Sequence, residues 1–185
     1  MNPFAKFFQS LAAFFGKPSP KPPMHDLSEL PILRGDGTWP WSAHVDGDDI
    51  VVINARATCF GGSNDPQDSG ETASGIPTKG NPTLLACSLP MIYTGSSKAL
   101  RKALGGSPLP KVPWRTAVEI RSGGKVLTVP VIDLGPAKYT GNAIDLTISA
   151  AKFFNPSATA TRFEMRCDFR IINGAHYLTG KATYK

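Results

Sequence analysis

The sequence predicts a strand-dominated protein, a small β-barrel with short helical insertions. Charged residues make up only 18% of the 185 residues, and the chain contains 18 glycines and 17 prolines. Short apolar runs, several of them alternating, recur between segments of turn-forming residues. A hydrophobic fraction of 41% is enough for a core. This combination favours one loop-rich β domain over a helical bundle.

The first 40 residues are predicted to lie outside that domain. Residues 1–16 predict an amphipathic helix, because apolar side chains recur at helical spacing with polar ones largely opposite. Three roles remain open for it: a packing or oligomerisation helix, contact with a membrane surface, or an atypical signal segment. It is too polar for a convincing signal peptide, and no small-residue cleavage site follows. Residues 17–40 are a proline-rich linker and irregular segment, and residues 41–185 form the body.

Within the body, apolar runs bounded by turn formers predict the strands. They cover residues 41–45, 50–60, 83–91, a hairpin over 115–135, and the runs 161–172 and 176–185. Residues 61–82 are almost all turn formers, and so long a loop in a compact domain is usually functional. Short helices are predicted at 96–106 and at 147–154, where Thr147 can act as the cap. No stretch of about 18 apolar residues occurs, so we expect no transmembrane helix.

Charge and cysteine content restrict the partners. The net charge of +6 favours anionic partners: nucleic acid, anionic lipid or an acidic cell-wall polysaccharide. The basic residues are scattered, so nucleic acid is not expected. Three cysteines, Cys59, Cys87 and Cys167, form no metal-binding motif, so neither a metal nor a cofactor is predicted. They are interpreted as buried apolar residues, with one disulfide plus one free thiol as the alternative.

Five short motifs occur in a fixed order along the body. They are Thr-Cys-Phe-Gly-Gly at 58–62, Thr-Ala-Ser-Gly at 72–75, Leu-Pro at 89–90, Val-Ile-Asp-Leu-Gly-Pro at 131–136 and Ala-Ile-Asp-Leu-Thr at 143–147. Over residues 55–185 this order resembles the double-psi β-barrel domains of rare lipoprotein A and the expansins. The resemblance implies a six-stranded barrel with a polysaccharide groove across one face. Rare lipoprotein A and related transglycosylases cleave peptidoglycan, whereas expansins loosen cell walls without hydrolysis.

The resemblance also implies roles for individual residues. By matching position, Asp133 is expected to be the catalytic acid, Asp65 the second carboxylate, and Asp145 a residue that organises the site. The residues expected to contact substrate are Thr58, Phe60, Gly61, Asp68, Thr72, Ser74, Tyr139 and Asp145. Cleavage of a glycosidic bond needs an acid with a raised pKa to protonate the leaving oxygen. Asp133 follows an apolar strand, and partial burial there would raise its pKa. Each assignment has a structural alternative, in which the side chain stabilises a turn or accepts backbone N–H bonds.

These residues predict cleavage of cell-wall glycan by a lytic transglycosylase-like reaction. A hydrolase needs a second carboxylate to activate water or to attack. A lytic transglycosylase can work with one acid/base, because a hydroxyl of the sugar itself closes on the anomeric carbon. The sequence offers one strand-end aspartate, Asp133, and a more loosely placed loop pair, Asp65 and Asp68. The alternative is a non-catalytic, expansin-like binding module, and either function implies an extracytoplasmic location.

Overall fold

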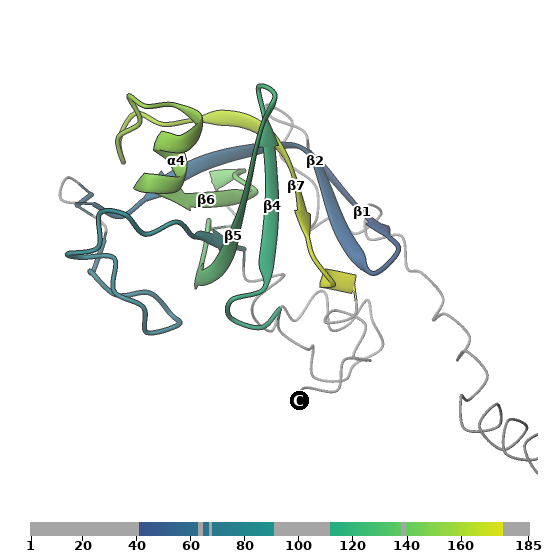
Figure 1. The fold of residues 1–185 in the computed structure, drawn as a ribbon, viewed down its shortest axis with the longest axis horizontal. Helices are drawn as coiled ribbons and strands as arrows, with labels where there is room; N and C mark the ends of the chain where they lie inside the picture. Colours follow the sequence, from purple (N-terminus) through teal and green to yellow (C-terminus); the bar gives the residue numbers. More distant parts are fainter. Residues whose placement is uncertain (1–40, 63–64, 67, 91–111, 138–139, 176–185) are drawn as a thin grey trace, which may run out of the picture.

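The computed structural model describes residues 41–62, 65–66, 68–90, 112–137 and 140–175 (Figure 1). Several predicted features lie outside these residues: the helix at 1–16, the linker at 17–40, the helix at 96–106, Tyr139 and the strand at 176–185. The described elements are β1 (Ser42–Asp46), β2 (Asp49–Phe60), β3 (Cys87–Leu89), β4 (Ala117–Ser122), β5 (Lys125–Leu134), β6 (Ile144–Thr147), α4 (Ile148–Phe154) and β7 (Met165–Ile171).

Six of these strands close into a barrel. Hydrogen bonding runs in the order β2, β6, β3, β5, β4, β7, and β7 pairs again with β2, while β1 pairs with β2 outside the ring. The pairs β2–β6 and β3–β5 are parallel, and the other pairs of the ring are antiparallel. The predicted strand-dominated, six-stranded barrel is therefore confirmed.

The predicted hairpin over residues 115–135 is present as β4–β5, and the strands predicted at 41–45 and 50–60 pair as a second hairpin, β1–β2. The β4–β5 turn contains Gly123 and Gly124 at φ +56° and +77°, a backbone conformation that glycine adopts without a steric penalty. Beyond the turn, β4 and β5 remain in register from the Ser122–Lys125 pair to the Ala117–Pro130 pair. The β1–β2 hairpin closes with the Asp46–Asp49 pair.

The barrel interior is filled by one side of each strand. On β6, Ile144 and Leu146 are fully buried in the core, and on β3, Cys87 and Leu89 occupy the same cluster. The largest fully buried side chains are Phe169, Ile50, Leu89, Ile120, Ile132, Ile144, Leu146 and Ile171. Because side chains alternate across a strand, residues 145 and 88 must point to the outer side of the barrel wall.

The segment before α4 differs from the prediction. The helix was predicted to begin at Thr147 with no strand before it, but residues 144–147 form the strand β6 and α4 begins at Ile148. The reason is long-range pairing, because β6 is held between β2 and β3 by two ladders that four residues cannot signal locally. Thr147 does precede α4, but its hydroxyl makes no capping bond. It donates to the Leu84 carbonyl and accepts the N–H of Ala86.

The tip of the β4–β5 hairpin contacts the end of α4. Lys125 Nζ donates to the carbonyls of Phe153 and Phe154, each at 3.0 Å, and lies over the Phe153 ring. A cation at a helix C-terminus compensates the unpaired carbonyls there. This contact joins the hairpin to the helix that follows β6.

The cysteines are free, so the alternative of one disulfide is wrong. Cys87 and Cys167 are buried in the core, as the interpretation as apolar residues expected, whereas Cys59 is only partly buried. In the described part of the chain, no helix has the length and apolar character needed to cross a bilayer.

Candidate functional site

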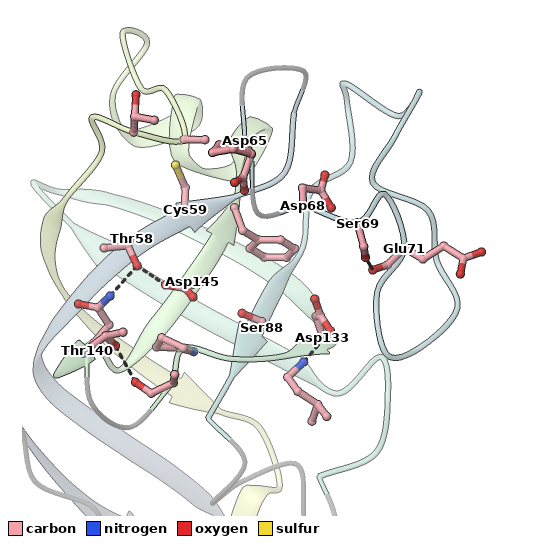
Figure 2. Close-up of a pocket in the computed structure, with 18 residues that line it drawn as sticks. Thr58, Cys59, Asp65, Asp68, Ser69, Glu71, Ser88, Asp133, Thr140 and Asp145 are labelled. Atoms are coloured by element: carbon pink, nitrogen blue, oxygen red, sulfur yellow. Dashed lines mark hydrogen bonds between the residues drawn. The ribbon is translucent and has the colours of Figure 1, made fainter.

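Four polar residues form a row across adjacent strands on the outer side of the barrel wall. Thr58 on β2 pairs with Asp145 on β6, Asp145 pairs with Ser88 on β3, and Ser88 pairs with Asp133 on β5. Figure 2 shows the four side chains in that order. Two predicted aspartates that are twelve positions apart in sequence are thus brought to the same surface, separated by a single strand.

A β-bulge places Asp133 in this row. The register between β3 and β5 advances from Cys87–Val131 to Ser88–Asp133, so β5 contains one extra residue, Ile132. Val131 and Ile132 are consecutive and both buried, which regular alternation would not allow. Bulges commonly redirect a side chain near functional sites. Here the bulge brings a carboxylate opposite Ser88 where an isoleucine would otherwise stand.

The row lines a groove with a volume of about 480 Å³. Its walls come from the loop after β2, the segment after β5 and residues 160–161. Six of the predicted site residues line it: Thr58, Phe60, Asp65, Asp68, Asp133 and Asp145. The predicted groove residues are therefore largely brought together.

Asp145 is the carboxyl whose chemistry is most altered by its surroundings. Burial raises its pKa to about 6, the Thr58 hydrogen bond opposes that rise, and the charges of Asp133 and Asp65 add to it. The Thr58 hydroxyl donates to Asp145 Oδ1, and Thr58 Oγ1 in turn accepts from Asn142 Nδ2 at 3.0 Å. With a pKa of about 6, both the protonated and the ionised form of Asp145 are populated near neutral pH, as a general acid/base requires.

Asp133 has a structural role through one of its two oxygens. Its Oδ1 accepts the N–H of Ala73 at 2.9 Å and that of Leu134 at 2.8 Å. The first bond ties the Thr-Ala-Ser-Gly loop to the end of β5. The backbone-acceptor alternative considered for Asp133 is thus present for this oxygen. Asp133 Oδ2 has no hydrogen-bond partner among the described residues, and the side chain lines the groove.

Ser88 lies in the groove lining and was not among the residues that the sequence predicted. It is 2% exposed, lines the groove, and its hydroxyl has no hydrogen-bond partner among the residues the structure describes. A methyl group at Gly135 would lie 3.4 Å from Ser88 Oγ and 3.6 Å from Asp145 Oδ2, so both atoms border the same small space. The sequence signal was the single polar residue between Cys87 and Leu89, in a strand of only three residues.

The loop aspartates are engaged in holding their own loop. Asp65 Oδ2 accepts the N–H of Gly61 at 2.9 Å. Asp68 accepts the Thr78 hydroxyl on both oxygens at 2.8 Å and the N–H of Gly70. Gly61 itself lines a separate, much smaller cavity beside the groove. Asp65 and Asp68 thus shape the groove wall while adding negative charge to it.

Besides Gly61, the predicted substrate contacts Thr72 and Ser74 do not line the groove. Thr72 is buried and its hydroxyl pairs with Ser74 Oγ at 2.9 Å and donates to the Ile76 carbonyl. The Ser74 N–H donates to the carbonyl of Ile132, the bulge residue. These bonds support the interpretation of both residues as turn stabilisers. These hydrogen bonds stabilise the Thr-Ala-Ser-Gly loop, to which Asp133 is also hydrogen-bonded through the N–H of Ala73.

The described residues offer no group of three or more His, Cys, Asp or Glu side chains that could hold a metal ion. Cys59 lies in the groove, where burial, and secondarily the charges of Asp145 and Asp65, raise its pKa to about 12. Such a thiol stays protonated at neutral pH and is a poor nucleophile. Cys59 is therefore a poor candidate for a nucleophile in this groove.

No family model matches this chain, and no curated protein matches it either. Among solved structures, the chain is similar to the Streptomyces papain inhibitor, with 19% sequence identity and a TM-score of 0.41. The match covers 68% of this chain and 96% of that one. A likeness of this degree does not carry an inference about function.

Proposed function

We propose that the groove binds cell-wall glycan and cleaves it by a lytic transglycosylase-like reaction on peptidoglycan. The observation that carries the proposal is the Asp145 carboxyl, whose pKa burial raises to about 6, in a row with Ser88 and Asp133 along an open groove. The two parallel strand pairs of the six-stranded ring also support the finer proposal that the barrel is of the double-psi type.

In this proposal Asp145 takes the acid/base role that the sequence predicted for Asp133. The protonated Asp145 carboxyl donates to the glycosidic oxygen as the bond to the anomeric carbon breaks. The resulting carboxylate then accepts the proton of the sugar hydroxyl that closes on that carbon. The negative charges of Asp133 and Asp65, which raise the Asp145 pKa, also stabilise positive charge developing on the sugar ring.

The loop contacts argue against Asp65 or Asp68 as the second carboxylate of a hydrolase. A hydrolase needs a second carboxylate to activate water or to attack. Asp65, which the sequence predicted for that role, accepts a backbone N–H of its own loop, and Asp68 has both oxygens bonded to Thr78. The same engagement is the observation that favours the second candidate, a non-catalytic wall-binding module.

The test measures release of muropeptides from purified sacculi by the full chain. We expect wild type to release products that end in anhydro sugars, which are lighter than hydrolytic products by one water. Asp145→Asn should abolish release while sacculus binding in a co-sedimentation assay stays intact. The asparagine of Asp133→Asn can still accept the Ala73 N–H, so this variant separates charge from loop anchoring.

The outcomes distinguish the candidates. Full release by Asp145→Asn with none by Asp133→Asn would return the acid role to Asp133. Products with hydrolytic ends would replace transglycosylation by hydrolysis. Binding without release by wild type would establish the wall-binding module and reject the enzyme.

A further inference from the structure

The groove and the whole chain have opposite charge. The chain carries a net charge of +6. The groove is lined by five carboxylates, Asp65, Asp68, Glu71, Asp133 and Asp145, and its described lining contains no lysine, arginine or histidine. A concave site of one sign concentrates ligands of the opposite sign and repels ligands of its own. The prediction of an acidic polysaccharide, drawn from the net charge, therefore does not fit the groove itself.

Unpartnered polar atoms add a second, independent indication of a ligand. Asn142 Oδ1, in the groove lining, is buried and has no hydrogen-bond partner in the described part of the chain, and such a polar group is costly. The Ser88 side chain is only 2% exposed, and its hydroxyl has no hydrogen-bond partner among the described residues. Asp133 Oδ2 and Asp145 Oδ2 likewise have none, because Oδ1 of each residue makes the bonds to protein groups. Three acceptor atoms on adjacent strands are thus open towards one groove.

The chemistry that fits these atoms is a cationic hydrogen-bond donor. An ammonium group has three N–H donors and no acceptor, and its bonds to carboxylates are charge-assisted. An acetamido group offers one N–H and a carbonyl oxygen that would face carboxylate lone pairs. A sugar carboxylate or a peptide carboxylate would be repelled.

We propose that the groove selects wall glycan whose sugars carry free amino groups, and that Ser88 Oγ and Asp133 Oδ2 accept the ammonium of one such sugar. This inference rests on the proposed glycan-binding function and narrows its substrate class. Asp145, next to Ser88 on the other side, remains available to the glycosidic oxygen of the neighbouring bond. The positive charge elsewhere on the molecule then meets the anionic remainder of the wall.

The experiment compares two oligosaccharides of equal length, the hexamers of glucosamine and of N-acetylglucosamine, by titration calorimetry with the full chain. At about 0.05 M salt we expect the glucosamine hexamer to bind about tenfold tighter, because one charge-assisted hydrogen bond contributes an affinity difference of about this size. At about 0.5 M salt the preference should shrink, because screening weakens charge pairs. Ser88→Ala and Asp133→Asn should each reduce the preference at low salt.

A matched control removes one negative charge outside the groove. Glu119 lies on β4 and pairs with Arg121, so Glu119→Gln should leave the tenfold preference unchanged. Equal affinity for the two hexamers, or tighter binding of the acetylated one, would overturn the inference and leave glycan binding standing. Binding of neither hexamer, together with no release from sacculi, would overturn the proposed function as well.

Discussion

Replacing Asp145 by asparagine is expected to stabilise the protein near neutral pH. In the folded chain burial raises the pKa of this carboxyl from 3.8 to about 6, so the fold disfavours its ionised form. Asparagine keeps the shape and an oxygen that can accept the Thr58 hydroxyl, but it carries no charge. The variant therefore removes the cost of ionising a buried group.

The magnitude follows from the pKa difference between the folded and unfolded states. At 1.36 kcal/mol for each pKa unit, a rise from 3.8 to about 6 corresponds to about 3 kcal/mol. Well below pH 3.8 the carboxyl is protonated in both states and this cost is absent. As the pH rises through about 6, the folded state must release the proton and the cost reaches its full value. The variant should thus match wild type at low pH and exceed it by up to about 3 kcal/mol at pH 8.

The assay is urea unfolding at several pH values, followed by tryptophan fluorescence, to which Trp41 in the core and Trp114 packed against it contribute. The informative quantity is the difference in free energy of unfolding between the variant and wild type, because other titrating groups cancel in it. Ser88→Ala serves as a control, since it alters the same row without removing a titratable group. A difference that stays constant from pH 4 to pH 8 would refute the burial argument, and with it the reason for choosing Asp145 as the acid.

Three further predictions concern the same groove. Thr58→Val removes the hydrogen bond that lowers the Asp145 pKa, so the alkaline limb of the pH–activity profile should move to higher pH, whereas Thr58→Ser should leave it in place. Gly135→Ala places a methyl group 3.6 Å from Asp145 Oδ2 at φ +152°, so it should reduce activity and cost about 1–3 kcal/mol of stability. Gly124→Ala, with open space around it, is the control for backbone strain alone. Because the pKa of Cys59 is raised to about 12, folded protein at pH 8 should react with iodoacetamide more than about a hundredfold slower at this residue than urea-unfolded protein; equal rates would contradict its burial.

The parts of the fold that could be predicted are those with local signals. A Gly-Gly turn between alternating apolar residues predicts the β4–β5 hairpin. The recurrence of short strands predicts a barrel, which the structure closes. The strand β6 could not be predicted, because its four residues are defined by pairing with β2 and β3 rather than by their own periodicity. The bulge at Ile132 has the same origin, since register with β3 places the extra residue there.

The sequence predicted which aspartates lie together, but it did not predict the raised pKa of Asp145. The motifs indicated Asp133 and Asp145 together, and the structure places both on one groove. The raised pKa of Asp145 depends on how residues distant in the chain cover it, which no local pattern encodes. One serine between two apolar residues is typical of any short strand, so the sequence does not distinguish Ser88 as a groove residue.

The polar row is positioned by backbone pairing within the barrel wall, whereas the groove walls are built largely by loops. Loops tolerate changes in length and sequence better than paired strands do. Insertions after β2 or β5 could therefore reshape the rim for a different polymer without displacing Thr58, Asp145, Ser88 and Asp133. Such a division allows the chemistry to be inherited unchanged while substrate preference diverges between descendants of one ancestral barrel.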